Sequence, residues 1–366
     1  MRSGITQYEK HSGQSGDSRP NMSLLQLPTE ILLQIFVYVG SSYILSDLSR
    51  LTVCRQWYEV ARIACFQEVT ITQETVHRLM SSPYAESNLA LVKDCTKTLN
   101  LDIFGHGDWS SMFLYSQTNA ELQQTRTGRP PSWNPELGEA CITGLNNHLL
   151  HLANVMKQSR KLRILSIETL FHLHGLSPIR FTPYLRFSTI HAFLSTTNLT
   201  SLNLDLCAAE LLPQPSSDHH ICTTIAALLG TLRYLRLRMR SICPEVLKPQ
   251  HHITKLHLNE VIINLNLFCK LPLIGVPYNS DCCASFSGDY LARNAGLEKQ
   301  AQLLAAQTAN PRIIRILALS SLRTPPLIEL QVFDALTGRY ISSREEPDEI
   351  FNSFKIEYSD AVRELK

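Results

Sequence analysis

Ten cysteines and thirteen histidines are the residues of this chain best suited to bind a metal or to react covalently. Zinc sites usually draw ligands from closely spaced pairs such as CxxC. The chain has no CxxC pair, because Cys282 and Cys283 are adjacent and the other cysteines lie scattered among apolar residues. The histidine pairs in FHLHG, DHH and QHH have no second ligand pair at a workable spacing. The spacing predicts no metal site, no cofactor, and reduced, buried thiols typical of cytoplasmic or nuclear proteins.

Motifs of the common enzyme classes are also missing from the sequence. It contains no GxSxG elbow, no phosphate loop ending in GK[ST], no GxGxxG and no HExxH. The stretch GHGDW, Gly105 to Trp109, comes nearest to a reactive cluster, but glycines that turn the chain account for it more simply. We therefore expect a non-catalytic protein. An enzyme remains the less favoured alternative, with an active site in the irregular segment from Asn264 to Tyr290.

Three arginines at alternate positions form the one unusual charge pattern. In YLRLRMR, Arg236, Arg238 and Arg240 point to one side of an expected strand, about 7 Å apart. Like charges at this spacing repel unless an anion or an acidic neighbour compensates them. One interpretation is a solvated face partly neutralised by Asp205. The other is a docking site, completed by His257, for an acidic or phosphorylated segment of a protein substrate, since arginine binds such groups through two parallel hydrogen bonds.

Composition limits the classes of protein to which the chain can belong. Its 366 residues, 44% of them hydrophobic, suffice for two domains or one large repeat domain. A net charge of +2 gives no general reason to bind nucleic acid or an anionic membrane. No apolar run approaches the roughly 18 residues of a membrane span. Residues 1–22 lack the apolar segment of a secretory signal and are expected to form a disordered tail.

The stretch LQLPTEILLQIFVYV, Leu25 to Val39, predicts a helix with an unusually wide apolar surface. Its helical stripe consists of Ile31, Leu32, Ile35, Phe36 and Val39. Leu33 and Val37 lie off this stripe and widen it. Further short helices are expected downstream, the first with Ser46 as N-cap and the next running through Trp57. About 40 residues of short helices enclose too little core for independent stability, so we expect one face to be buried against a second protein.

The residues of these helices closely resemble those of the F-box, the adaptor-binding module of cullin-RING ubiquitin ligases. The resemblance rests on LPTEILLQIF followed by DLSRLTVCRQWYEVA, joined by a link, VGSSYILSDL, that is a few residues longer than usual. It implies a Skp-type adaptor as partner and, through the adaptor, a cullin. By position, it implies an interface or its immediate support formed by Leu27, Pro28, Ile31, Ile35, Leu48, Leu51, Val53, Cys54 and Trp57. The alternative is a helical cap of the following domain.

A recurring strand pattern follows the helical segment. The pattern apolar-x-x-apolar-x-apolar begins at Thr96 (weakly), Leu162, Leu199, Leu232, Ile253, Ile314 and Leu327. Helix-compatible stretches separate several of these strands, and the whole resembles a leucine-rich-repeat solenoid. The spacing of the starts is irregular, which favours a degenerate, curved array. In this register Leu165, Leu202 and Leu235 enter the core, and the residues between them face the inner surface.

These patterns predict an α/β protein with a short three-helix F-box-like module followed by an irregular, leucine-rich-repeat-like curved solenoid. The expected boundaries are a tail at 1–22, the module at 23–66 and the array at 67–366, with a mobile insertion at about 105–139. The implied function is the substrate-recognition subunit of an SCF-type ubiquitin ligase that holds an unknown protein target, in the cytoplasm, the nucleus or both. The alternative is a scaffold that binds an adaptor without directing degradation.

Overall fold

The computed structural model describes residues 24–45, 47–104, 135–170, 184–207, 209, 211, 220–250, 255–267, 283, 290–322 and 327–343. They belong to two compact units, Met1–Cys65 and Phe66–Lys366. The predicted tail and residues 105–134 of the predicted insertion lie outside the described residues. Residues 135–139 were expected to belong to the insertion, but they begin helix α7 (Pro135–Met156). No helix within the described ranges is long and apolar enough to cross a membrane.

Short helices build the first unit. They are the 3-10 turns η1 (Leu24–Gln26) and η2 (Leu48–Leu51) and the helices α1 (Thr29–Val39), α2 (Ser41–Leu45) and α3 (Arg55–Cys65). Helix α1 ends at Gly40, whose φ of 87° lies in the region that favours glycine and whose N–H donates to the Phe36 carbonyl. The buried core of this unit consists of Leu32, Phe36, Ile44, Val60, Ala61, Ala64 and Cys65.

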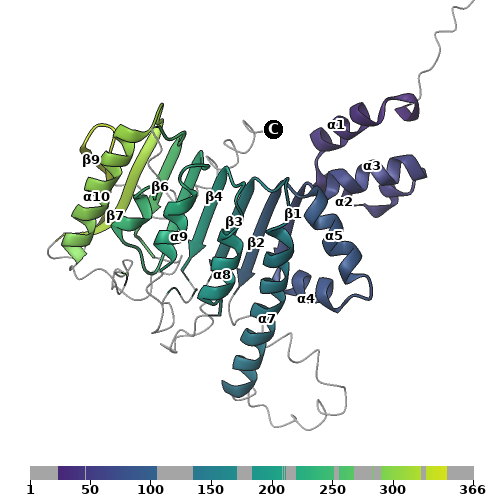
Figure 1. The fold of residues 1–366 in the computed structure, drawn as a ribbon, viewed down its shortest axis with the longest axis horizontal. Coiled ribbons are helices and arrows are strands. Elements are labelled where there is room, and N and C mark those ends of the chain that lie inside the picture. The colour runs from purple at the N-terminus through teal and green to yellow at the C-terminus, as the bar shows by residue number, and fades with distance from the viewer. Residues whose placement is uncertain are drawn as a thin grey trace, which may run out of the picture. The chain divides into compact units, whose positions relative to one another are not determined.

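A nine-stranded open sheet forms the second unit within its described residues, and its strands lie side by side in the order of the sequence (Figure 1). The strands are β1 (Glu68–Thr72), β2 (Thr98–Phe104), β3 (Ile164–Leu170), β4 (Ser201–Leu206), β5 (Tyr234–Met239), β6 (Glu260–Asn264), β7 (Ile313–Leu322), β8 (Leu327–Asp334) and β9 (Arg339–Ser343). Strands β1 to β7 pair in parallel, whereas β8 and β9 continue the sheet in antiparallel fashion.

Helices connect the parallel strands, as parallel pairing requires. They are α4 (Gln73–Ser81), α5 (Ala85–Cys95), α7, α8 (Phe187–Leu194), α9 (Ile221–Leu228), the 3-10 turn η3 (Pro244–Leu247) and α10 (Tyr290–Gln307). Helix α8 packs between α7 and α9, and these three helices cover the same face of the sheet (Figure 1). Alternate leucine and isoleucine residues of β2 to β7 meet the helices in one continuous core. The mixed α/β class expected from the sequence is therefore confirmed.

The strand predicted from Ile253 is not formed in its described part, residues 255–258, and its first two residues lie outside the described ranges. The strand of this region is β6, which begins at Glu260, and Leu256 makes only an isolated bridge to Thr308. The pattern at Leu327 does mark a strand, β8, but β8 runs antiparallel and is not a further parallel repeat. The patterns starting at Leu162, Leu199 and Leu232 fall on β3, β4 and β5, each two residues before the strand begins.

Truncating a core leucine should destabilise the second unit strongly. Leu202 is paired in register with Leu165 on one side and Leu235 on the other, and all three are buried. We expect Leu202→Ala to lower the free energy of unfolding by about 2–5 kcal/mol, because it removes apolar contacts and leaves a cavity. Leu303→Ala, at a half-exposed position of α10, should change it by no more than about 0.5 kcal/mol. Denaturant melts measure both; the reverse ranking would contradict the strand register.

Candidate functional site

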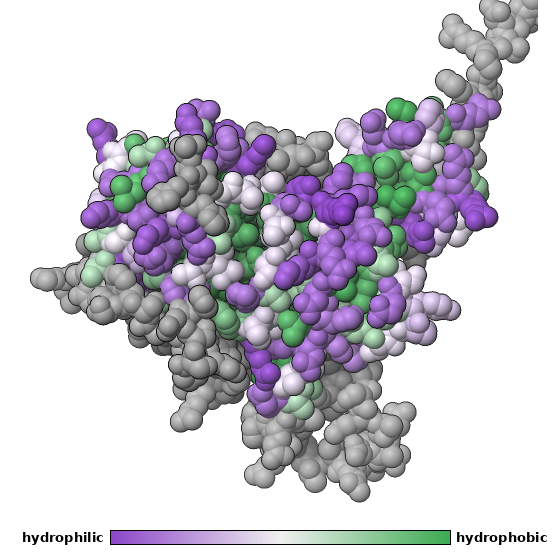
Figure 2. Space-filling model, viewed as in Figure 1, coloured by the Kyte–Doolittle hydropathy of each residue, from purple (hydrophilic) through white to green (hydrophobic). Residues whose placement is uncertain are grey.

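An apolar face of α1 points away from the core of its own unit. Ile31, Ile35 and Tyr38 follow one another at helical spacing and are 41%, 36% and 94% exposed. Leu33 and Val37, the residues off the predicted stripe, pack against the core together with Leu32 and Phe36. The stripe is thus divided between interior and surface, and its exposed members are Ile31, Ile35 and Val39. Figure 2 shows hydrophobic residues on the surface over and between α1 and α3.

The Leu27-Pro28 pair adjoins this face at the start of α1. Pro28 is exposed, and its carbonyl accepts hydrogen bonds from the N–H groups of Ile31 and Leu32 at 3.0 and 3.1 Å. The fixed φ of proline suits this position, and its missing N–H leaves no helix hydrogen bond unmade. Leu27 is half-buried and packs against the core. Val53, in the loop before α3, is 58% exposed. Pro28 and Val53 are therefore available at the surface, whereas Leu27 is only partly so.

Trp57 and Cys54 shape the module from within. The Trp57 ring packs edge-on against Phe36 with ring centroids 4.5 Å apart, and its Nε1 donates a hydrogen bond to the Arg50 carbonyl. The Cys54 Sγ accepts the backbone N–H of Trp57 at 3.4 Å, so it caps the first turn of α3. Leu51 packs partly buried against the same core. These three residues therefore support the exposed face more than they contribute to it, and the side chain of Leu48 lies outside the described residues.

The turn η2 fixes the loop that presents Val53. Asp47 is its N-cap, because the carboxylate Oδ1 accepts the N–H of Ser49 at 3.0 Å. Interaction with the Ser49 side chain, together with this backbone hydrogen bond, holds the pKa of the Asp47 carboxyl below its ordinary value. The guanidinium of Arg50 lies 3.9 Å from the centre of the Tyr43 ring, which ties η2 to α2. The predicted N-cap, Ser46, lies outside the described residues.

A comparison with protein families identifies this helical segment. Residues 24–67 match the F-box-like family. The match runs from η1 through α3, so the chain carries an F-box-like domain that includes the exposed face of α1. F-box domains generally bind Skp-type adaptors, which are partners outside the chain. No curated protein matches the chain.

The arginines of β5 are engaged by carboxylates inside the protein. Arg238 is only 6% exposed, and both Nε, at 2.8 Å, and Nη2 bind the carboxylate of Asp205, its partner in register on β4. Arg236 is 8% exposed, and its Nε lies 2.6 Å from the Glu260 carboxylate on β6. The inference that their mutual repulsion demands an external anion is therefore wrong, because Asp205 and Glu260 supply the negative charge.

The other two residues of the predicted anion site are placed differently. Arg240 is half-buried and follows the end of β5, whereas His257 is exposed and lies outside any strand, three residues before β6. The predicted alignment of His257 with the arginines in neighbouring strands is therefore wrong. The four residues therefore do not form one anion-binding cluster on the sheet. The exposed face of α1 is the stronger candidate for binding another protein.

Proposed function

We propose that this chain is the non-catalytic substrate-recognition subunit of an SCF-type ubiquitin ligase. Its F-box-like domain would bind a Skp-type adaptor and, through it, a cullin. The observation that carries the proposal is the exposure of Ile31 and Ile35 on α1, inside the segment that matches the F-box-like family. Exposed aliphatic side chains at i and i+4 on one helix form an apolar ridge, and burial of such a ridge by a partner is favourable.

The second unit would hold the protein target. Its parallel strands lie in the order of the sequence, and the connecting helices lie on one face. A degenerate leucine-rich-repeat array would have the same arrangement. The antiparallel pair β8 and β9 follows the last parallel strand, where such arrays need a cap. In this role the chain would act by proximity, because a target held on the sheet unit has a high effective concentration at the ubiquitin-transfer machinery.

Affinity purification of the full chain, with the ligase inhibited, tests the proposal. We expect an adaptor and a cullin to co-purify, together with target proteins that accumulate under inhibition. A variant that lacks residues 24–66 should still bind the targets but should lose both the adaptor and the cullin. Absence of the adaptor and cullin from the wild-type preparation would overturn the proposal. Targets that bind but keep the same half-life when the ligase is inhibited would favour the scaffold alternative.

A further inference from the structure

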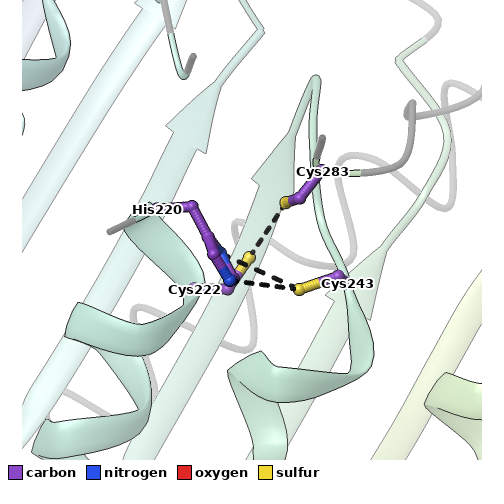
Figure 3. Close-up of side chains that lie close together, drawn as sticks. All are labelled: His220, Cys222, Cys243 and Cys283. Carbon is purple, nitrogen blue, oxygen red and sulfur yellow. Dashed lines mark hydrogen bonds between the residues drawn. The ribbon is translucent and has the colours of Figure 1, made fainter. Parts of the chain in front are cut away.

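Three cysteines and one histidine from separate parts of the chain meet beside the sheet (Figure 3). His220 directly precedes α9, and Cys222 lies in the first turn of α9. Cys243 directly precedes η3. Cys283 comes from the connection between β6 and α10. The four side chains point toward one another, although His220 and Cys283 lie 63 positions apart along the chain.

The separations of the four groups approach those of a tetrahedral metal site. The sulfur atoms of Cys222 and Cys283 are 3.6 Å apart. The Cys243 sulfur lies 3.8 Å from Nδ1 and 3.9 Å from Nε2 of His220. Around a tetrahedral zinc, with bonds of about 2.3 Å to sulfur and about 2.0–2.1 Å to nitrogen, neighbouring ligands lie about 3.6–3.8 Å apart. All four ligand atoms lie within 4.8 Å of one another, so a small contraction would complete the tetrahedron.

The cluster is closed to solvent. All four residues are buried, and the largest exposed fraction among them is the 7% of His220. The neighbouring residues Ile221, Ile242 and Val246 are buried and apolar. A common ligand would hold together four potential ligand groups that are already in contact within apolar surroundings. A buried site with four protein ligands leaves no open position for substrate, which is typical of structural zinc.

The thiols of the cluster differ in their electrostatics, because burial raises the pKa of Cys222 well above its ordinary value. Hydrogen bonds from the Cys222 and Cys283 thiols, opposed by burial, hold the pKa of Cys243 well below its ordinary value. The hydrogen bond to Cys243 raises the pKa of His220. Thiolate is the form of cysteine that binds metals. These hydrogen bonds join the same four side chains whose placement favours a shared ligand.

We propose that His220, Cys222, Cys243 and Cys283 form a structural zinc site of the Cys₃His type. The ion would link the start of α9, the start of η3 and the connection between β6 and α10. Both nitrogens of His220 lie at similar distances from the Cys243 sulfur, so a rotation of the ring selects the one that binds. The site is separate from the F-box-like domain, and its presence does not depend on adaptor binding.

Zinc analysis of the full chain, purified under reducing conditions from zinc-supplied cells, tests the site. We expect about one tightly held zinc ion per chain. Replacing zinc by Co²⁺ should give the visible absorption of a tetrahedral ion together with a thiolate-to-cobalt charge-transfer band. Stripping the metal with a chelator should lower the melting temperature of the second unit, and added zinc should restore it. Metal-free protein that acquires neither zinc nor the cobalt spectrum would overturn the proposal.

Variants separate the cluster from other thiols. Cys243→Ser should lose bound zinc and the charge-transfer band, whereas Cys95→Ala, which removes another buried cysteine, should keep both. His220→Cys should retain zinc, because a Cys₄ set also binds zinc tetrahedrally, and it covers the case in which Cys243→Ser fails to fold. Zinc retained at the same stoichiometry by Cys243→Ser would exclude this site. A Cys222–Cys283 disulfide in protein isolated without reductant and lacking zinc would identify a redox pair instead.

Discussion

Asp205→Ala should lower the free energy of unfolding of the sheet unit by about 3–5 kcal/mol, because it leaves the buried guanidinium of Arg238 without the carboxylate that faces it. Asp205 binds Arg238 through both of its carboxylate oxygens, and the two side chains are 12% and 7% exposed. Denaturant unfolding of the wild type and the variant measures the difference. The expected loss is of the same size as that of a core leucine truncation.

Two further variants identify the cause of this loss. Glu74→Ala breaks an ion pair with Arg78 whose side chains are 55% and 76% exposed, so its cost should stay within about 1 kcal/mol. The double variant Asp205→Leu/Arg238→Met should recover most of the stability, because apolar side chains of similar volume often replace a buried ion pair without loss. Equal costs for Asp205→Ala and Glu74→Ala would show that the β4–β5 pair is solvated.

Local periodicity was sufficient to predict the central strands of the sheet. Leu165, Leu202 and Leu235 alternate with more polar residues, and this alternation specifies which side of each strand enters the core. The same reasoning failed at Ile253, because Leu256 and Leu258 are buried without forming a strand of the ladder. The true strand, EVIIN, is buried on both faces, and its apolar centre of three adjacent residues, VII, shows no alternation.

Contacts between residues that are far apart in the chain could mostly not be predicted from the sequence. The neutralisation of Arg238 by Asp205 could be anticipated from neighbouring strands, but Glu260 had been assigned to no strand, so its pairing with Arg236 was missed. The Cys₃His cluster was missed for the same reason. Its four residues come from three segments, and only His220 and Cys222 are close in sequence, so no closely spaced ligand pair of a usual zinc motif indicates it.

The resemblance to the F-box identified the residues of the α1 region but not which of them are exposed. Position in the motif selected Ile31, Ile35, Val53, Cys54 and Trp57 together, whereas the helices separate them into surface and support. The signal that distinguishes them is the packing of α1 on α3 through Phe36 and Trp57, which depends on the crossing of two helices. Distinguishing the exposed residues from the supporting ones therefore required the structure.

Ile35→Asp should abolish co-purification of a Skp-type adaptor with the full chain. If Ile35 is buried in the complex, the variant places an unpaired carboxylate in an apolar interface, at a cost of several kcal/mol. In the unbound chain Ile35 is 36% exposed, so the carboxylate can remain solvated and the domain should stay folded. Co-purification from cells that express the adaptor, with circular dichroism of the variant to verify folding, measures the effect.

Leu303→Asp provides the matched control, because Leu303 is a 47% exposed aliphatic residue of a helix outside the F-box-like domain. It should leave adaptor binding at the wild-type level. Val53→Asp should weaken binding in the same direction as Ile35→Asp if the loop before α3 belongs to the interface. Equal loss of adaptor in the Leu303→Asp protein would point to a general effect of the added charge.

Calorimetric titration of purified Skp-type adaptor into the full chain tests the adaptor-binding face most directly. We expect saturable binding by the wild type and by Leu303→Asp. For Ile35→Asp we expect a dissociation constant at least about 100-fold higher, since each 1.4 kcal/mol lost corresponds to a factor of ten. An Ile35→Asp protein that is folded and binds the adaptor with the wild-type dissociation constant would contradict a role for the α1 face, and a wild-type chain that binds no adaptor would contradict the proposed function.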